Sequence, residues 1–464
     1  MSIPYWVEDA VFYQIFPDRF ANGDPANDPP NVQPWGSIPT TWGYQGGDLR
    51  GIIQHFDYLL DLGINAIYLN PIFLATSNHR YNTTDYFRID PKLGTLADFH
   101  ALISVAHRND VHVILDGVFN HCGRGFFAFT DLLENQERSP YRDWFHISRF
   151  PVDAYSPGPA TDYLGWWRHK SLPKFNTDTP DVRKFLLSVG RYWIEQGADG
   201  WRLDVPNEID DDLFWAEFRQ VVKAANPEAY LLGEIWEILP RWCDDQHFDG
   251  LMNYPFREAV LGFIGKTIPP SQVGERLERL LKVYPCENIN AMYLVLGSHD
   301  TERVSTLFEG DLRKIKMALL FQFAFPGIPG IYYGDETGME GGKDPGCRGA
   351  FPWDSTQWKD SLQPFVRHLV HLRKRMSVLR RGSYQQLLVD DTRGIFVFSR
   401  SLGEENLVAA FNAGPTRRTV HLPVERLGWA DGRIIRDLIG TEETIVSGET
   451  LTIVLPPWSG LWLT

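Results

Sequence analysis

The stretch ADGWRLD, residues 198–204, is a short and largely apolar run that ends in an acidic residue. Runs that are apolar on both faces are typical of strands buried inside a parallel sheet. Seven other stretches have the same form: VFYQIFPD (11–18), INAIYLNP (64–71), VHVILDGVFNH (111–121), AYLLGEIW (229–236), FDGLMN (248–253), MYLVLGSHD (292–300) and GIPGIYYGDE (327–336). The chain is therefore predicted to contain eight buried parallel strands.

Amphipathic stretches separate most of these runs. Two of them are LRGIIQHFDYLLDLG (49–63) and DVRKFLLSVGRYWIEQG (181–197), in which apolar residues recur at helical spacing. Strand and helix thus alternate eight times, which predicts an α/β fold of the (β/α)8 TIM-barrel type. In such barrels the functional side chains lie at the carboxyl ends of the strands.

The division into domains follows from two breaks in this alternation. Residues 122–180 are rich in Pro, Gly and aromatic residues and make an unusually long connection, which predicts a small lobe inserted after the third strand. After residue 378 only strand-like runs with turns between them remain, which predicts a C-terminal antiparallel β-sandwich. The barrel then comprises residues 1–121 and 181–378, and the sandwich residues 379–464.

The composition narrows the class of ligand. The 464 residues include 45 Lys and Arg against 59 Asp and Glu, which gives a net charge of −14 and argues against a nucleic-acid partner. No apolar run is long enough to cross a membrane. The beginning of the chain lacks the pattern of a secretory leader, so we expect a cytoplasmic protein. Carboxylates combined with 14% aromatic residues suit a neutral, polyhydroxylated ligand.

Three acidic residues at predicted strand ends stand out. Arg202 and Asp204 lie two residues apart, so both project to the same side of their strand, where Arg202 is expected to keep Asp204 ionised. Glu234 ends the next strand among apolar neighbours, an environment expected to raise its pKa. Such a pair suits glycoside cleavage, which needs an ionised nucleophile and a protonated acid. Asp300 could stabilise a cationic transition state.

A tyrosine and three histidines lie near the same predicted strand ends as these acids. His121 follows the third strand, His79 and Tyr81 lie beyond the second, and His299 precedes Asp300. Each residue alone is more often structural, but their joint placement at successive strand ends favours a sugar-binding site.

These motifs resemble those of a known family. DGVFNH, GWRLDVPNE, GEIW, LGSHD and GIYYGDE are similar, in order, to the motifs of the α-amylase family, glycoside hydrolase family 13. The resemblance implies that Asp204 is the nucleophile, Glu234 the general acid/base and Asp300 the transition-state stabiliser. It also implies a set of substrate-binding residues: Arg202, His121, His299, Tyr81, His79, Trp236 and Asn207.

Two further motifs resemble one subfamily. LPKFN (172–176) and VPNE (205–208) are similar to the MPKLN and VANE motifs of neopullulanases, cyclomaltodextrinases and maltogenic amylases. Pro206 and Glu237 depart from the usual Ala and His of that subfamily, which affects the expected balance of hydrolysis and transglycosylation and the acceptor preference. The subfamily usually has an N-terminal β domain that this sequence does not show. We therefore expect a monomer, or a dimer unlike the domain-swapped one, with a more open cleft.

A loop rich in Asn and Asp predicts a structural calcium site. Hard oxygen ligands close together in a loop suit Ca²⁺, although an Asx-rich turn would have the same composition. The resemblance to the calcium loop of the neopullulanase group favours calcium and adds a glycine carbonyl. The implied ligands are Asn22, Asp24, Asn27, Asp28, Gly46 and Asp48.

The predicted function is that of a retaining α-glucan hydrolase. Its expected substrates are cyclomaltodextrins, maltooligosaccharides, starch or pullulan, cleaved at α-1,4 bonds, with some transglycosylation. An α-glucanotransferase or a trehalose-forming isomerase of the same family is the alternative. A non-catalytic glucan-binding homologue is disfavoured, because Asp204, Glu234 and Asp300 are all present.

Overall fold

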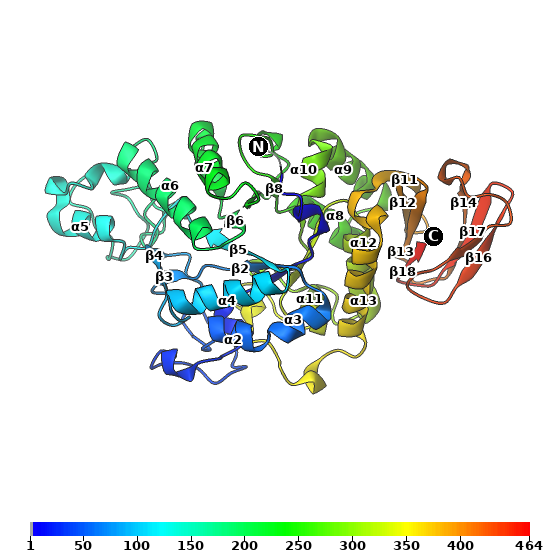
Figure 1. The fold of residues 1–464 in the computed structure, drawn as a ribbon, viewed down its shortest axis with the longest axis horizontal. Helices are drawn as coiled ribbons and strands as arrows, with labels where there is room; N and C mark the ends of the chain where they lie inside the picture. The colour runs from blue at the N-terminus through cyan, green and yellow to red at the C-terminus, as the bar shows by residue number, and fades with distance from the viewer. Residues whose placement is uncertain (1–2) are drawn as a thin grey trace.

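Eight parallel strands form the centre of the structure, a computed structural model that describes residues 3–464 (Figure 1). Each strand falls within one of the eight predicted runs: β1 (Phe12–Ile15), β2 (Ala66–Leu69), β5 (His112–Gly117), β6 (Gly200–Leu203), β7 (Tyr230–Gly233), β8 (Gly250–Leu251), β9 (Tyr293–Leu294) and β10 (Ile328–Tyr332). Their hydrogen-bonded order is β8-β7-β6-β5-β2-β1-β10-β9. A parallel bridge between Met252 and Tyr293 joins the two outer strands. The predicted TIM barrel is thus confirmed.

Buried aromatic and aliphatic side chains fill the inside of the barrel. Phe12, Tyr68, Leu232 and Tyr293 belong to one apolar cluster and are fully shielded from solvent. Trp6 belongs to the same cluster and stacks on the ring of His112, with 4.0 Å between ring centroids. The barrel is therefore a packed core, and only its rim can carry a site.

Helices surround the barrel: α2 (Leu49–Gln54), α3 (Phe56–Leu62), α4 (Leu96–Arg108), α6 (Pro180–Glu195), α7 (Asp212–Ala225), α8 (Tyr254–Ile264), α9 (Pro270–Val283), α10 (Cys286–Asn290), α12 (Leu312–Ala324) and α13 (Leu362–Arg375). Three shorter helices are α1 (Pro17–Phe20), α11 (Val304–Leu307) and α14 (Ser377–Arg381). The predicted helix over 49–63 is divided in two at His55, whose ring stacks on Trp353 at 3.6 Å.

The connection between β5 and α6 contains helix α5 (Phe127–Asn135), which lies at the far left of Figure 1. Isolated bridges pair His121 with Lys174 and Gly165 with Pro173, and thereby fasten the end of this connection to the barrel rim. A second excursion, after β2, forms a hairpin of β3 (Phe73–Ala75) and β4 (Thr83–Ile89) that the sequence patterns did not predict.

Two four-stranded antiparallel sheets form the C-terminal part, as predicted, and appear at the right of Figure 1. The first contains β11 (Ser383–Asp390), β12 (Ile395–Leu402), β13 (Glu405–Asn412) and β18 (Ser459–Leu463); the second contains β14 (Arg418–Pro423), β15 (Ile434–Arg436), β16 (Glu443–Ser447) and β17 (Thr450–Leu455). Val397 packs between the sheets, whereas its neighbours Phe396 and Phe398 pack against Phe321 of α12. The first sheet therefore joins the sandwich to the barrel.

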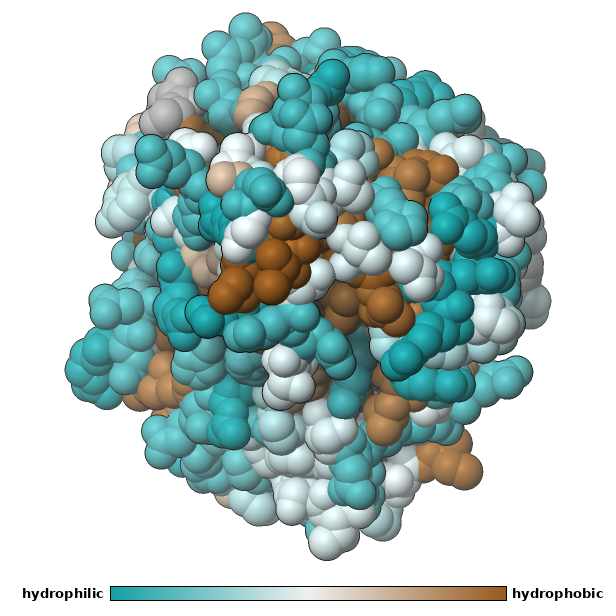
Figure 2. All heavy atoms as spheres, turned by 90° about the vertical axis from the view of Figure 1, so that its right-hand side faces the viewer, coloured by the Kyte–Doolittle hydropathy of each residue, from teal (hydrophilic) through white to brown (hydrophobic). Residues whose placement is uncertain are grey.

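The surface at the C-terminal end contains both hydrophilic and hydrophobic residues. Figure 2 shows small apolar patches there, divided by hydrophilic side chains. Within residues 3–464, no helix combines the length and apolar character needed to cross a bilayer. All four cysteines are free; Cys286 is exposed and the other three are buried.

Candidate active site

The ends of β6 and β7 bring two acidic residues together. Asp204 and Glu234 follow these strands directly, and their backbone N–H groups donate to Gly117 and Leu203 at 3.0 Å, which continues the parallel ladder by one residue. Val205 then adopts a left-handed conformation, with φ of +37°, and its N–H donates to Glu234 Oε2 at 3.0 Å. The turn after Asp204 thus fixes the carboxyl group of Glu234.

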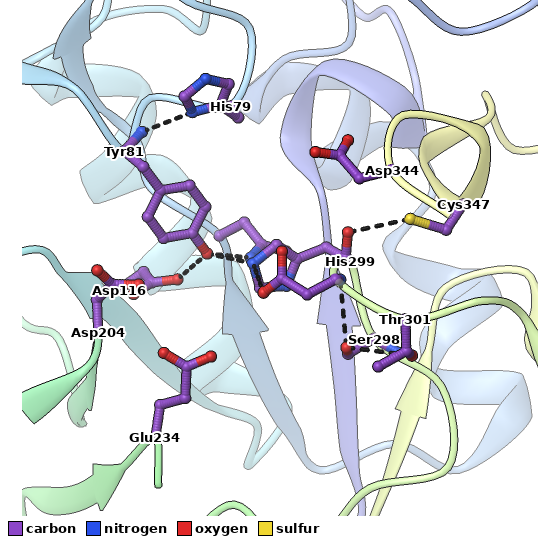
Figure 3. Close-up of polar contacts among 12 residues, drawn as sticks. His79, Tyr81, Asp116, Asp204, Glu234, Ser298, His299, Thr301, Asp344 and Cys347 are labelled. Atoms are coloured by element: carbon purple, nitrogen blue, oxygen red, sulfur yellow. Dashed lines mark hydrogen bonds and ion pairs between the residues drawn. The ribbon is translucent and has the colours of Figure 1, made fainter. Parts of the chain in front are cut away.

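Arg202 holds three carboxylates at once. Its Nη1 donates to Asp116 Oδ1 at 2.7 Å and to Asp204 Oδ1 at 3.0 Å, and its Nη2 lies 2.7 Å from Glu234 Oε1. The guanidinium group is fully buried. Figure 3 shows the carboxyl groups of Asp204 and Glu234 converging from neighbouring strands on the space beside the Tyr81 hydroxyl.

Arg202 contacts Asp204, as predicted, but it does not bring the pKa of that carboxyl group below the usual range. Burial raises the pKa of Asp204 well above its usual range, and the charge of Arg202, which opposes this, is shared with Glu234 and Asp116. Burial also raises the pKa of Glu234, as predicted. Burial therefore shifts both carboxyl groups towards the neutral form.

The pKa of Asp300 is shifted in the opposite direction. Burial alone would raise its pKa, but His299 and Arg348 outweigh burial and hold the pKa of Asp300 well below its usual range. His299 Nε2 lies 3.0 Å from one carboxylate oxygen, and Arg348 Nη2 donates to the other at 3.0 Å. Asp300 therefore favours the ionised form, whereas burial favours the neutral form of Asp204 and Glu234.

Tyr81 connects the two groups of acids. Its hydroxyl donates to Asp116 Oδ2 at 2.8 Å and lies 2.5 Å from His299 Nε2, and its ring stacks on that imidazole with an interplanar angle of 5°. Gln14 Nε2 donates to His299 Nδ1 at 2.8 Å, so the ring carries its proton on Nε2. Tyr68 also donates to Asp116 Oδ2, at 2.6 Å.

Arg348, Gln14 and Tyr68 belong to this network but were not predicted. Tyr68 could have been found from strand alternation, since it lies on a predicted strand. Gln14 also lies on a predicted strand, but its polar side chain gives no signal of what it contacts. Arg348 comes from a loop far along the chain and has no sequence signal.

The remaining predicted residues lie around this network. His121 is buried, its ring stacks on Trp166, and burial lowers its pKa to about 3. Burial also lowers the pKa of His79 to about 3, and its Nδ1 accepts from the N–H of Tyr81. Trp236 is half-exposed and stacks on Tyr254 at 3.6 Å. Asn207 is exposed on the short turn after Asp204.

The Asn- and Asp-rich loop forms one cluster. Asn22 Nδ2 donates to Asp28 Oδ1 at 2.9 Å, and Asn27 Nδ2 donates to Asp48 Oδ2 at 3.0 Å. The carbonyl oxygens of both amides are buried and have no hydrogen-bond partner in the described structure. The carboxylate of Asp24 instead accepts from Arg50 at 3.0 Å.

Gly46 makes room for this cluster. It has a φ of +83°, and a Cβ there would lie 2.3 Å from Asp28 Oδ1 and 2.5 Å from Asn22 Nδ2. No three His, Cys, Asp or Glu side chains of residues 3–464 come together as a metal-binding group. The cluster nevertheless contains two unpartnered amide oxygens beside the carboxylates of Asp28 and Asp48, which are oxygen donors of the kind that Ca²⁺ takes.

The chain matches known proteins over its full length. Residues 14–377 match the α-amylase catalytic domain, and residues 384–462 match the maltogenic amylase C-terminal domain. A cyclomaltodextrinase of Geobacillus thermopakistaniensis (strain MAS1) is 45% identical over 458 residues, which cover 98% of this chain and 76% of that protein. Neopullulanase 2 of Thermoactinomyces vulgaris is 41% identical over 466 residues, which cover 100% of this chain and 78% of that protein.

A solved structure extends the likeness to the fold. The cyclic α-maltosyl-(1→6)-maltose hydrolase of Arthrobacter globiformis, in complex with that cyclic sugar, has a TM-score of 0.89 and 40% identity and covers 100% of both chains. The barrel, the acidic residues at its strand ends and these matches lead to one conclusion. The chain belongs to the α-amylase family and is a glycoside hydrolase of its cyclomaltodextrinase, neopullulanase and maltogenic amylase group.

Proposed function

We propose that this enzyme is a retaining hydrolase of α-1,4-glucosidic bonds in cyclomaltodextrins, maltooligosaccharides, starch or pullulan. The observation that carries the proposal is the contact of one buried guanidinium group, that of Arg202, with both Asp204 and Glu234. Two carboxyl groups beside one reacting bond are what double displacement at a sugar carbon requires. The relatives named above support the choice of α-glucans.

The proposed reaction has two steps. In the reactive state the proton is on Glu234, which gives it to the glycosidic oxygen while the Asp204 carboxylate bonds to the anomeric carbon. Water then attacks that carbon, Glu234 takes a proton from the water, and Asp204 leaves. The low pKa of Asp300 keeps a negative charge near the positive charge that develops on the sugar.

A product profile tests the substrate class. The purified enzyme is incubated with β-cyclodextrin, soluble starch, pullulan and cyclic α-maltosyl-(1→6)-maltose, with and without an added sugar acceptor. We expect hydrolysis of the α-1,4 bonds, with maltose from β-cyclodextrin and panose from pullulan. Products that form only when an acceptor is present would instead identify a glucanotransferase, and trehalose would identify the isomerase alternative.

We also propose that the Asn- and Asp-rich loop holds a structural Ca²⁺ ion. The buried, unpartnered oxygens of Asn22 and Asn27, with Asp28, Asp48 and the Gly46 carbonyl, would supply hard ligands. Asp24 is the remaining predicted ligand. The ion would stabilise the loop and take no part in the reaction.

Metal analysis and melting curves test the calcium proposal. We expect one Ca²⁺ per chain, a Tm that falls in EDTA and recovers with Ca²⁺, and no effect of EDTA on a variant with Asp28→Ala. Absence of bound metal together with an unchanged Tm in EDTA would contradict it. The predicted oligomeric state and cytoplasmic location remain predictions; sedimentation velocity measures the first.

A further inference from the structure

Three aromatic rings form a stack that leads from the acidic site to the surface. The ring of Trp166 stacks on His121, with centroids 5.3 Å apart and an interplanar angle of 20°. Trp167 stacks in turn on Trp166, at 4.7 Å and 12°. His121 is 1% exposed, whereas Trp167 is 74% exposed. The stack therefore begins in the core of the site and ends in solvent.

The turn that carries the two tryptophans is well anchored. Trp166 N–H donates to Leu172 O at 2.9 Å, and Lys174 N–H donates to Leu164 O at 2.9 Å. Lys174 also pairs with His121 through a backbone bridge. The turn is thus tied directly to the residue on which its first ring stacks.

Trp167 is exposed at a conformational cost. Its φ is +46° and that of Arg168 is +64°, both in the left-handed region that favours glycine. Such strain persists at functional positions, because the surrounding structure must maintain it. A bulky ring kept in solvent by a strained backbone points to a role outside folding.

A groove lies beside the turn that carries the two tryptophans. Gly165 and Arg168, which flank the tryptophans, line a groove of about 890 Å³ on the connection between β5 and α6. Trp166 Nε1 and His121 Nε2 are buried and have no partner in the described structure. An indole face can pack against the C–H face of a sugar ring, so the exposed face of Trp167 suits a ligand of that kind.

We propose that Trp167 is a sugar-stacking platform that extends the glucan-binding cleft outward from His121 and favours long glucans over short ones. This inference rests on the proposed function, because it takes the ligand to be an α-glucan. The ring adds contacts only for substrates long enough to reach it, so its contribution depends on chain length.

Steady-state kinetics with maltotriose and maltoheptaose test the platform. Wild type is compared with Trp167→Ala, Trp167→Phe and Trp167→Gly. For the Ala and Gly variants we expect the preference for maltoheptaose, as the ratio of the two kcat/KM values, to fall about three- to tenfold through KM, the size of a lost ring contact. Trp167→Phe, which keeps a ring, should retain most of the preference.

Tyr5→Ala is the matched control, since Tyr5 is 78% exposed and precedes β1, at the opposite end of the barrel. Tyr5→Ala should prefer maltoheptaose over maltotriose to the same extent as wild type. Trp167→Gly relieves the left-handed strain, so its Tm should not fall, and a loss of preference in it cannot come from misfolding. If the ratio of kcat/KM for maltoheptaose and maltotriose were unchanged in Trp167→Ala, the proposal that Trp167 is a sugar-stacking platform would be contradicted. Failure of wild type to cleave either sugar would instead contradict the proposed function.

Discussion

Arg202 determines the charge balance of the site. Its single positive charge is shared by Asp116, Asp204 and Glu234, while Asp300 has its own partners in Arg348 and His299. When carboxylates outnumber cations in a buried space, the neutral form of a carboxyl group is favoured. In the proposed mechanism, the proton that this arrangement favours on Glu234 is the one given to the leaving group.

Neutral replacements test the roles of the two acids. Asp204→Asn removes the nucleophile and Glu234→Gln removes the proton donor, and each should lower kcat by about a thousandfold or more, which is roughly 4 kcal/mol of transition-state stabilisation. Far-ultraviolet circular dichroism should remain that of wild type.

Asp210→Asn is the control for these variants, since Asp210 is an exposed acid six residues beyond Asp204 that pairs with Arg241. It should retain wild-type activity. Turnover within tenfold of wild type in Asp204→Asn would remove Asp204 from the mechanism.

Contacts between residues of the same strand could be predicted from their spacing in the sequence. The interval between Arg202 and Asp204 correctly indicated that they share a side of β6. It did not reveal that Glu234 and Asp116 compete for the same guanidinium group, because those contacts come from neighbouring strands. The error in the pKa of Asp204 follows from this missing information.

At the scale of elements, the turn after β10 contains a buried acid, Glu336, that has no salt-bridge partner among residues 3–464. Glu336 Oε1 accepts from Tyr13 at 2.7 Å and from Tyr58 at 2.6 Å, while its Oε2 has no partner in the described structure. Burial raises the pKa of Glu336 to about 7. Because the folded-state pKa exceeds the unfolded one, the protonated group favours folding at low pH, and this contribution is lost as the pH rises through about 7.

Glu336→Gln should therefore flatten the pH dependence of stability. Ionising Glu336 in the folded state costs up to roughly 3 kcal/mol, which the neutral variant avoids. We expect the Tm of the variant relative to wild type to increase between pH 5 and pH 9, measured by calorimetry. A constant difference over this range would show that Glu336 does not titrate as described.

Elements were predictable where burial imposes a continuous apolar pattern. All eight barrel strands fall inside such runs, because both of their faces are covered. The β3–β4 hairpin was missed, since much of β4, TTDYFRI, is polar and half exposed. The helix expected over 49–63 is divided at His55, whose ring stacks on Trp353, a residue some 300 positions away in sequence.

At the scale of the whole molecule, the sandwich and the barrel share a core. Phe321 of α12 stacks on Phe411 of β13 at 4.7 Å, and both belong to the main apolar cluster. Strand-like runs with turns between them predicted β12 and β13, but they could not show that α12 covers the second face of these strands. The C-terminal sheets are thus part of the support of the barrel.

In the proposed mechanism, the barrel holds Asp204 and Glu234 on either side of one glycosidic bond, so that two displacements retain the configuration of the anomeric carbon. Proton NMR of the first product formed from a maltooligosaccharide, recorded before mutarotation, tests this most directly. Two inversions at the same carbon predict that the new reducing end appears as the α anomer. Appearance of the β anomer first would show a single displacement by water and would contradict the role of Asp204 as nucleophile.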